Sequence, residues 1–116
     1  IIGAADGGAF TTVEDMTKLW DAFWTYGILP EEIIRIFTKL YSSVETEGKD
    51  IYYGHGIWIY DNGRGTSEEY VEGCDAGVSF RSGRNRGSDL EVTVISNTTS
   101  GVWPILREID ALTRAG

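Results

Sequence analysis

The sequence is poor in the residues that build disulfides, metal centres and basic surfaces. Its 116 residues include one cysteine, Cys74, and one histidine, His55. These cannot form an intrachain disulfide, a zinc ribbon or a histidine-rich metal site, so we expect no metal and no cofactor. Ten basic against 18 acidic side chains leave a formal charge of −8, and this charge repels a phosphate backbone. Nucleic acid is therefore not an expected partner.

Long apolar runs are also missing. No stretch of about 18 apolar residues occurs, and Ile1-Ile2-Gly3 lacks the basic and apolar regions of a signal peptide. We therefore expect no membrane span and a soluble chain. With 41% hydrophobic and 24% charged residues, the composition is typical of a single globular unit with a modest core.

The common catalytic and nucleotide-binding motifs fail. Gly77-Val-Ser79-Phe-Arg81 has arginine where a hydrolase nucleophile elbow needs its second glycine, and no phosphate-binding glycine motif occurs. His55 could act as a general base, but it is better explained as a strand residue near a bend. The pair Glu31-Glu32 is better explained as first-turn acids that complement a helix dipole.

Apolar spacing predicts three helices. Thr12 supplies an N-cap for a helix over residues 13–26 that stops at Gly27. Pro30 begins a second helix that runs to about Leu40, and Ser100 caps a third. The predicted apolar faces are Val13, Met16, Trp20, Phe23 and Trp24; Ile33, Ile34, Phe37, Leu40 and Tyr41; and Val102, Ile105, Leu106, Ile109 and Leu112. Aromatic residues at helical spacing could line a ligand cleft, but core packing is the simpler interpretation.

After a polar, turn-like segment at residues 42–50, the period of the sequence becomes that of strands. Residues 51–53 and 57–60 flank a Gly54-His55-Gly56 bend, and further strands are expected at 66–71, 77–82 and 90–95. Hairpin turns are expected at 61–65 and 83–87. The pattern predicts an α+β fold, in which an antiparallel meander of about four strands carries two N-terminal helices and one C-terminal helix.

One ordered set of motifs is more specific than any single signal. Its segments are Gly7-Gly8-Ala-Phe-Thr-Thr12-Val-Glu-Asp15-Met, Tyr53-Gly-His-Gly56-Ile-Trp58, Val71-Glu-Gly73-Cys-Asp-Ala-Gly77-Val-Ser79 and Val94-Ile-Ser-Asn97. In this order they resemble the C-terminal part of the serine β-lactamase and penicillin-binding-protein family, and in particular its class C β-lactamase-related members, which are bacterial serine hydrolases. The resemblance covers nearly the whole chain and implies a partial β-lactamase/transpeptidase-like fold.

The resemblance implies an active-site strand at residues 71–74. The family's Lys-Thr-Gly or His-x-Gly element falls on Val71, Glu72 and Gly73, so its cation is replaced by valine and its hydroxyl residue by glutamate. Loss of that cation argues against penicillin-like or D-Ala-D-Ala-like substrates. Gly73 keeps room for a substrate beside the strand, and the backbone N–H of Cys74 would contribute to the oxyanion hole. The alternative is that residues 71–79 are an ordinary strand, turn and strand.

The family's other two catalytic elements are not found. The first is a Ser-x-x-Lys that holds the acylated serine. No serine is followed three residues later by lysine, so this nucleophile is absent from these residues. The second is a Tyr-x-Asn, and Tyr60-Asp-Asn62 has that spelling but is better explained as turn chemistry. The resemblance thus implies that residues 1–116 are one unit, the C-terminal fragment of a larger domain, without catalytic residues of their own. A small-molecule or peptide-like acyl substrate would bind only in the parent protein, in the bacterial cytoplasm or cell envelope.

Two other functions stay open. A non-enzymatic binding module would use the Trp-rich helices and the strand around Tyr53 and Trp58 as a partner surface. A hydrolase-derived pseudoenzyme is suggested by Val71 and Glu72. In a fragment, the exposed sheet edge and apolar face predict self-association or domain swapping.

Overall fold

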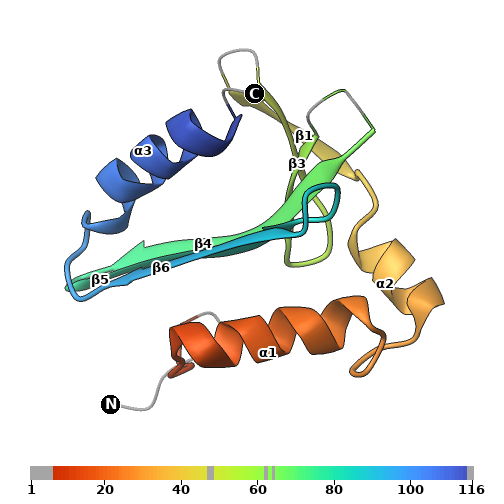
Figure 1. Cartoon of the computed structure of the whole chain (residues 1–116), viewed down its shortest axis with the longest axis horizontal. Helices are drawn as coiled ribbons and strands as arrows, with labels where there is room; N and C mark the ends of the chain where they lie inside the picture. The colour runs from red at the N-terminus through yellow and green to blue at the C-terminus, as the bar shows by residue number, and fades with distance from the viewer. Residues whose placement is uncertain (1–6, 47–48, 62, 64, 115–116) are drawn as a thin grey trace.

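The computed structural model describes residues 7–46, 49–61, 63 and 65–114 of the chain. They form an α+β fold of three helices and six strands (Figure 1). In chain order the elements are α1 (Val13–Trp24), α2 (Glu31–Phe37), β1 (Ser42–Thr46), β2 (Lys49–Tyr53), β3 (Trp58–Asp61), β4 (Ser67–Asp75), β5 (Val78–Asn85), β6 (Leu90–Ser96) and α3 (Val102–Arg114). The predicted α+β class and the placement of the helices are confirmed.

The strands form a single antiparallel sheet in the order β1-β2-β3-β4-β5-β6. Each strand pairs with its sequence neighbour, as a meander requires, but the predicted number of about four strands is too low. The polar segment 42–50 is not a turn, because β1 pairs along its whole length with β2, from Ser42 opposite Tyr53 to Thr46 opposite Lys49. An outer strand has one open side, so it can form without the apolar alternation that marks a buried strand.

One of the two predicted hairpin turns lies where it was expected, and the other does not. The β3–β4 hairpin forms where it was predicted, with Asp61 opposite Ser67, although Asn62 lies outside the described residues. The next hairpin turn comes later than predicted, because β5 continues through Gly83 to Asn85. The Asn85 side chain then accepts hydrogen bonds from the backbone N–H groups of Gly87 and Ser88. An asparagine that bonds backbone groups two or three residues ahead starts a turn by itself.

The two long helices cover opposite faces of the sheet (Figure 1). Helix α1 contacts β6 on one face, and α3 contacts β5 and β6 on the other. The main core lies beneath α1, where Trp20 donates a hydrogen bond from Nε1–H to Ser82 Oγ at 2.8 Å. Its buried members are Met16, Trp20, Ile57 and Ile59, with Phe23, Trp24, Tyr52, Val71 and Phe80 packed around them. The aromatic stripe of α1 is therefore a core element.

Helix α1 starts as predicted and ends two residues early. Thr12 caps it by accepting a hydrogen bond from the Asp15 N–H at 3.1 Å. At the other end the residue with positive φ is Tyr26, at 62°, and not a glycine. The Gly27 N–H then bonds to the Ala22 carbonyl at 2.8 Å, which is the long bond of a Schellman motif. Gly27 takes part in the stop, but the left-handed position belongs to a tyrosine.

The other two helices also differ from expectation at their ends. Helix α2 stops at Phe37, so Leu40 and Tyr41 fall outside it and are exposed. At the start of α3 the Val102 N–H bonds to Ser79 Oγ at 3.3 Å. The side chain that bonds the first turn of α3 is thus Ser79 on β5 and not the predicted Ser100. A residue 23 positions away in sequence cannot be recognised as a cap from local spacing.

Candidate active-site edge

The strand β4 has an open edge at the residues that the sequence selects. Its ladder with β3 ends where Trp58 faces Tyr70, whereas its ladder with β5 continues to Asp75, which faces Val78. Within the described part of the chain, residues 71–75 therefore have a strand neighbour on one side only. Alternate residues of such a segment carry N–H and C=O groups that no ladder satisfies.

The first two residues of this edge are held by the fold. Val71 is half-buried and packs against the core beneath α1. Glu72 faces Arg81 on β5, and its Oε2 lies 3.7 Å from Arg81 Nη1. The position at which the family resemblance expects a cation thus holds an apolar core side chain, and the residue after it is an acid in an ion pair.

Gly73 and Cys74 are the accessible part of the edge. Both residues are exposed, and Cys74 is a free thiol. A Cβ atom added at Gly73 would have no neighbour within 4 Å, so packing inside the described chain does not explain the glycine. The missing side chain leaves open space beside the strand, as a site for a ligand backbone would need.

The hairpin that ends this edge is anchored to the start of α3. The Gly77 N–H donates to Thr99 Oγ1 at 2.9 Å, and the Ser79 hydroxyl donates to the Thr98 carbonyl at 2.7 Å. Ser79 is fully buried and accepts from Val102 as well. These bonds hold the open end of β4 against residues 98–102. The sequence did not predict this role of Ser79, because its partners are distant in the chain.

Arg81 is the cation nearest to the edge in the strand register, and its charge is already matched. Its guanidinium carbon lies 3.8 Å from the centre of the Tyr70 ring. Its Nη2 lies 3.4 Å from Glu68 Oε1, which adds to the contact with Glu72. With 15% of its side chain exposed, Arg81 is poorly placed to bind a substrate carboxylate.

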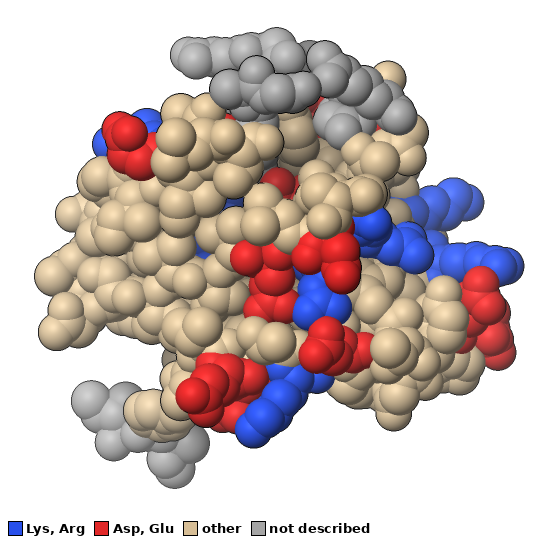
Figure 2. Space-filling model, in the orientation of Figure 1, with Lys and Arg blue, Asp and Glu red and all other residues tan. Residues whose placement is uncertain are grey.

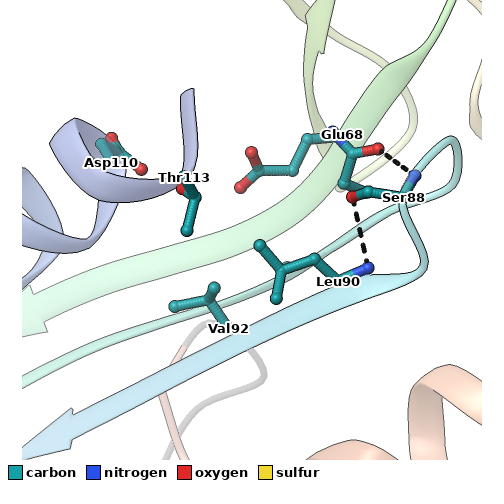
Figure 3. Close-up of a pocket in the computed structure, with 8 residues that line it drawn as sticks. Glu68, Ser88, Leu90, Val92, Asp110 and Thr113 are labelled. Carbon is teal, nitrogen blue, oxygen red and sulfur yellow. Dashed lines mark hydrogen bonds between the residues drawn. The ribbon is translucent and has the colours of Figure 1, made fainter. Parts of the chain in front are cut away.

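A shallow polar pocket lies under the C-terminal half of α3 (Figure 3). Glu68 points into it from β4, Asp110 and Thr113 come from the helix, and Leu90 and Val92 line the floor. The pocket does not include any of residues 71–74. No group of three or more His, Cys, Asp or Glu side chains in the described residues could hold a metal ion.

The other two candidates from the sequence, His55 and Glu31, make contacts that stabilise the fold. The His55 ring packs edge-on against Tyr41, with ring centres 4.6 Å apart, and the backbone N–H of His55 donates to the Phe37 carbonyl. Glu31 forms an ion pair with Arg35 one turn along α2, at 2.6 Å. None of these groups lies on the open edge of β4.

Below α1 the sheet buries charged residues that the sequence analysis did not select. Arg84 bonds to Asp21 Oδ1 at 2.7 Å and to Glu91 Oε2 at 2.5 Å. Burial lowers the pKa of Arg84, but these bonds outweigh it and the net pKa is raised. Glu69 is 2% exposed, and it accepts from the Ser67 hydroxyl through Oε1. Its Oε2 is buried without a partner among the described residues.

Glu69 gives a pH-dependent prediction. Burial raises the pKa of its carboxyl, against the lowering effects of the Ser67 hydrogen bond and of Arg86. The folded state then holds this proton more tightly than the unfolded state, so stability falls as pH rises from the ordinary glutamate pKa through the raised one. Glu69→Gln should therefore stabilise the protein at pH 7 by about 1 kcal/mol, and the gain should vanish below about pH 4.

Urea unfolding at a series of pH values would measure this difference. Glu108→Gln, at an exposed site on α3, is the matched control and should stay within about 0.5 kcal/mol of the parent protein throughout. A loss of stability in Glu69→Gln at pH 7 would contradict the raised pKa of Glu69.

The fold and the open edge can be compared with known proteins. No protein-family model and no curated protein sequence matches the chain. Among solved structures, it matches the crystal structure of penicillin binding protein from Bacillus halodurans with 36% sequence identity and a TM-score of 0.85. The match covers 95% of this chain and 33% of that chain. The chain thus resembles one part of a penicillin-binding protein in sequence and in fold, and spans about a third of its length.

The match agrees with the family resemblance that the motifs suggested. It extends over nearly all 116 residues, with residues 71–74 in a strand as that resemblance expects. None of the helices in the described residues has the length and apolar character needed to span a membrane.

Proposed function

We propose that the chain is the C-terminal part of a β-lactamase-like serine hydrolase and forms one wall of its acyl-enzyme cleft. The open edge of β4 at residues 71–75 carries the proposal. An extended acyl substrate, an ester or an amide, would lie beside this edge, with its carbonyl near residues 73 and 74. The likeness to a third of a penicillin-binding protein supports the same arrangement.

The chemistry assigned to this wall is positioning and electrostatic. Backbone N–H groups on a rigid strand stabilise the oxyanion of a tetrahedral intermediate because they need no reorganisation during the reaction. In this proposal the Cys74 N–H has that role and its thiol has none. The bonds of Gly77 and Ser79 to residues 98, 99 and 102 hold the strand in place.

The nucleophile must come from outside these residues. No Ser-x-x-Lys occurs in the sequence, and an isolated serine hydroxyl is a weak nucleophile without an activating base. We therefore propose that the chain alone is not acylated. Because Val71 replaces the expected cation and Arg81 is paired with Glu68 and Glu72, the proposed substrate has no carboxylate at this position.

These same two observations favour a pseudoenzyme as the second candidate. In that case the cleft would be present and an acyl group would not be transferred. The two candidate functions predict different behaviour only for the intact protein, which is acylated if it is a hydrolase and is not acylated if it is a pseudoenzyme.

The test uses the longest polypeptide of the cell that carries these residues, treated with a fluorescent fluorophosphonate and with a fluorescent penicillin. We expect acylation by the fluorophosphonate and weak or no labelling by the penicillin. Gly73→Val should slow acylation about 100-fold, because its side chain fills the space beside the strand and keeps the substrate carbonyl away from the Cys74 N–H, which is equivalent to losing an oxyanion donor.

Gly7→Val is the matched control, because a Cβ at Gly7 also has open space and its φ is not positive. It should be labelled at the parent rate. Equal labelling of both variants would refute the cleft-wall role. An intact Ser-x-x-Lys without any labelling would favour the pseudoenzyme, and a polypeptide without that motif would favour a binding module.

A further inference from the structure

A row of aromatic side chains crosses the sheet at the point where the open edge of β4 begins. Tyr53 on β2 lies opposite Trp58 on β3, and Trp58 lies opposite Tyr70 on β4. The Tyr53 and Trp58 rings meet at 65° with their centres 4.7 Å apart, and the Trp58 and Tyr70 rings are stacked with their centres 6.3 Å apart. Because directly opposite residues share a face of an antiparallel sheet, the three rings form one surface. We call it the aromatic row.

The aromatic row lies on the α3 face of the sheet. Gly83, which is opposite Tyr70 on β5, lines the pocket under α3. Strand residues alternate between the two faces, and Ile59, the neighbour of Trp58, belongs to the core beneath α1. Along the row, exposure increases away from β5, because Tyr70 is 3% exposed, Trp58 is half-buried and Tyr53 is 38% exposed. The two outer rings are therefore accessible.

The innermost ring of the row already binds a cation of the chain itself. The guanidinium carbon of Arg81 lies 3.8 Å from the centre of the Tyr70 ring. Glu68 and Glu72 provide the negative charge, at 3.4 and 3.7 Å from Arg81. A cation is attracted to an aromatic face by the ring quadrupole and to a carboxylate by its charge. This face of the sheet thus combines the two groups that hold a cation.

Trp58 has the same kind of acid beside it without a cation of its own. Glu72 is two residues beyond the Trp58–Tyr70 pair, so Trp58 and Glu72 are diagonal neighbours with Cα atoms about 7–8 Å apart. Among the described side chains, no lysine or arginine lies over the ring of Trp58 or Tyr53. A group of a few ångströms between Trp58 and Glu72 would touch both.

Glu72 also keeps negative charge that Arg81 does not balance. One guanidinium is shared by two carboxylates, and Glu72 has the longer contact. Its side chain is 30% exposed, against 14% for Glu68. Glu72 is therefore the acid of this pair that a ligand can reach.

The composition of the open edge adds to this charge. Residues 71–75 are Val-Glu-Gly-Cys-Asp, which contain two acids and no basic residue. Elsewhere the charges are more evenly mixed, as Figure 2 shows by the acidic and basic side chains interleaved across the centre of its view. A cation near this edge is thus favoured and an anion is repelled.

We propose that Trp58, Tyr53 and Glu72 bind a cationic group of the acyl substrate, an alkylammonium ion on the acyl chain. This inference rests on the proposed function of residues 71–75 as a cleft wall. Glu72 and Cys74 are two strand positions apart, which is about 7 Å. A substrate carbonyl at the Cys74 N–H therefore leaves the cation at some distance from the reacting atoms, where it determines specificity.

Charge complementarity selects an alkylammonium ion over other groups. An apolar group would cover the rings but would remove water from Glu72 without giving it a partner, which is costly. An anion would meet Glu72 at close range. Tryptophan is the aromatic side chain that attracts a cation most strongly, so the position of Trp58 beside an exposed acid fits a cation best.

Isothermal titration calorimetry tests the proposal without requiring turnover. The protein is the longest polypeptide of the cell that carries these residues, and the probes are 4-(trimethylammonio)butanamide and its uncharged isostere 5,5-dimethylhexanamide. We expect the cationic amide to bind at least about fivefold more tightly than the isostere, from a cation–π contact and an ionic contact together. This preference should fall when NaCl is raised from about 50 to about 500 mM.

Variants assign the preference to the named residues. Glu72→Gln should reduce it to about twofold or less. Glu31→Gln is the matched control, because Glu31 is also an acid paired with an arginine, on α2, and it should keep the preference of the parent protein.

Two aromatic variants test the ring itself. Trp58→Leu should remove most of the preference, and Trp58→Phe should keep part of it, because a ring remains. Circular dichroism checks folding, and Tyr53→Leu, at a more exposed ring, is the second site if the Trp58 variants do not fold.

Equal binding of the two amides, or no measurable binding of either, would overturn the proposal. An equal effect of Glu72→Gln and Glu31→Gln would do the same. The p-nitrophenyl esters of the two acids distinguish this failure from failure of the proposed function. Hydrolysis of both esters at one rate keeps the cleft wall and refutes the cation site. Binding of the cationic amide that depends on Glu72, without hydrolysis of either ester, supports the cation site and refutes the hydrolase.

Discussion

Trp20→Ala should lower the free energy of unfolding by about 3–5 kcal/mol, the usual cost of removing a buried aromatic side chain. Trp20 is 3% exposed and belongs, with Met16 and Ile59, to the core beneath α1. The substitution also removes the donor to Ser82 Oγ. A domain of this size has only about 5–15 kcal/mol of stability in total, so a large share of the stability should be lost.

Urea unfolding followed by circular dichroism would measure this loss without relying on tryptophan emission. Trp20→Phe separates packing from hydrogen bonding, because Ser82 keeps its bond to the Thr93 hydroxyl. This variant should cost about 1–2 kcal/mol. Phe10→Ala, at a fully exposed aromatic residue, should change stability by less than about 0.5 kcal/mol. Similar losses for Trp20→Ala and Phe10→Ala would mean that α1 does not form the core described.

Gly54→Ala should destabilise the protein by about 2–4 kcal/mol, through steric overlap and one lost hydrogen bond. A Cβ at this position would overlap the carbonyl oxygen of Phe37 and come within 3.2 Å of the Ile57 side chain. That carbonyl accepts a hydrogen bond from the His55 N–H. Moving it aside would separate the end of α2 from the bend between β2 and β3.

Gly56→Ala is the matched control for this prediction. Gly56 has a φ of +75° and open space around a Cβ, so alanine there meets only backbone strain of about 1–2 kcal/mol. Thermal unfolding of the two variants would compare them directly. A smaller loss for Gly54→Ala than for Gly56→Ala would contradict the close contact with Phe37.

The helices could be predicted because their signals are local. The Thr12 cap, the apolar spacing of α1 and the position of Pro30 at the start of α2 all act within a few residues. The errors occur where a distant residue decides. The Ser79 hydroxyl, and not Ser100, bonds the first turn of α3, and β1 forms because β2 is there to pair with it.

For the candidate site, the sequence predicted the strand but not the charges around it. The order of glycines selected residues 71–74, and that segment lies on a strand with an open edge. Which charges surround it could not be predicted. Glu68, Glu72 and Arg81 come together only through the β4–β5 register, and Glu69 is buried only in the folded sheet, where it faces Arg84 on β5.

By itself, the sequence determined the α+β class, the antiparallel meander, the three helices and a strand over residues 71–74, because each depends on periodicity or on the order of short motifs. Only the tertiary structure decided the six strands, the pairing of Arg81 and the burial of Glu69. Strand register and helix placement bring together residues far apart in the chain, and both are set by the free energy of packing the whole sheet between its helices.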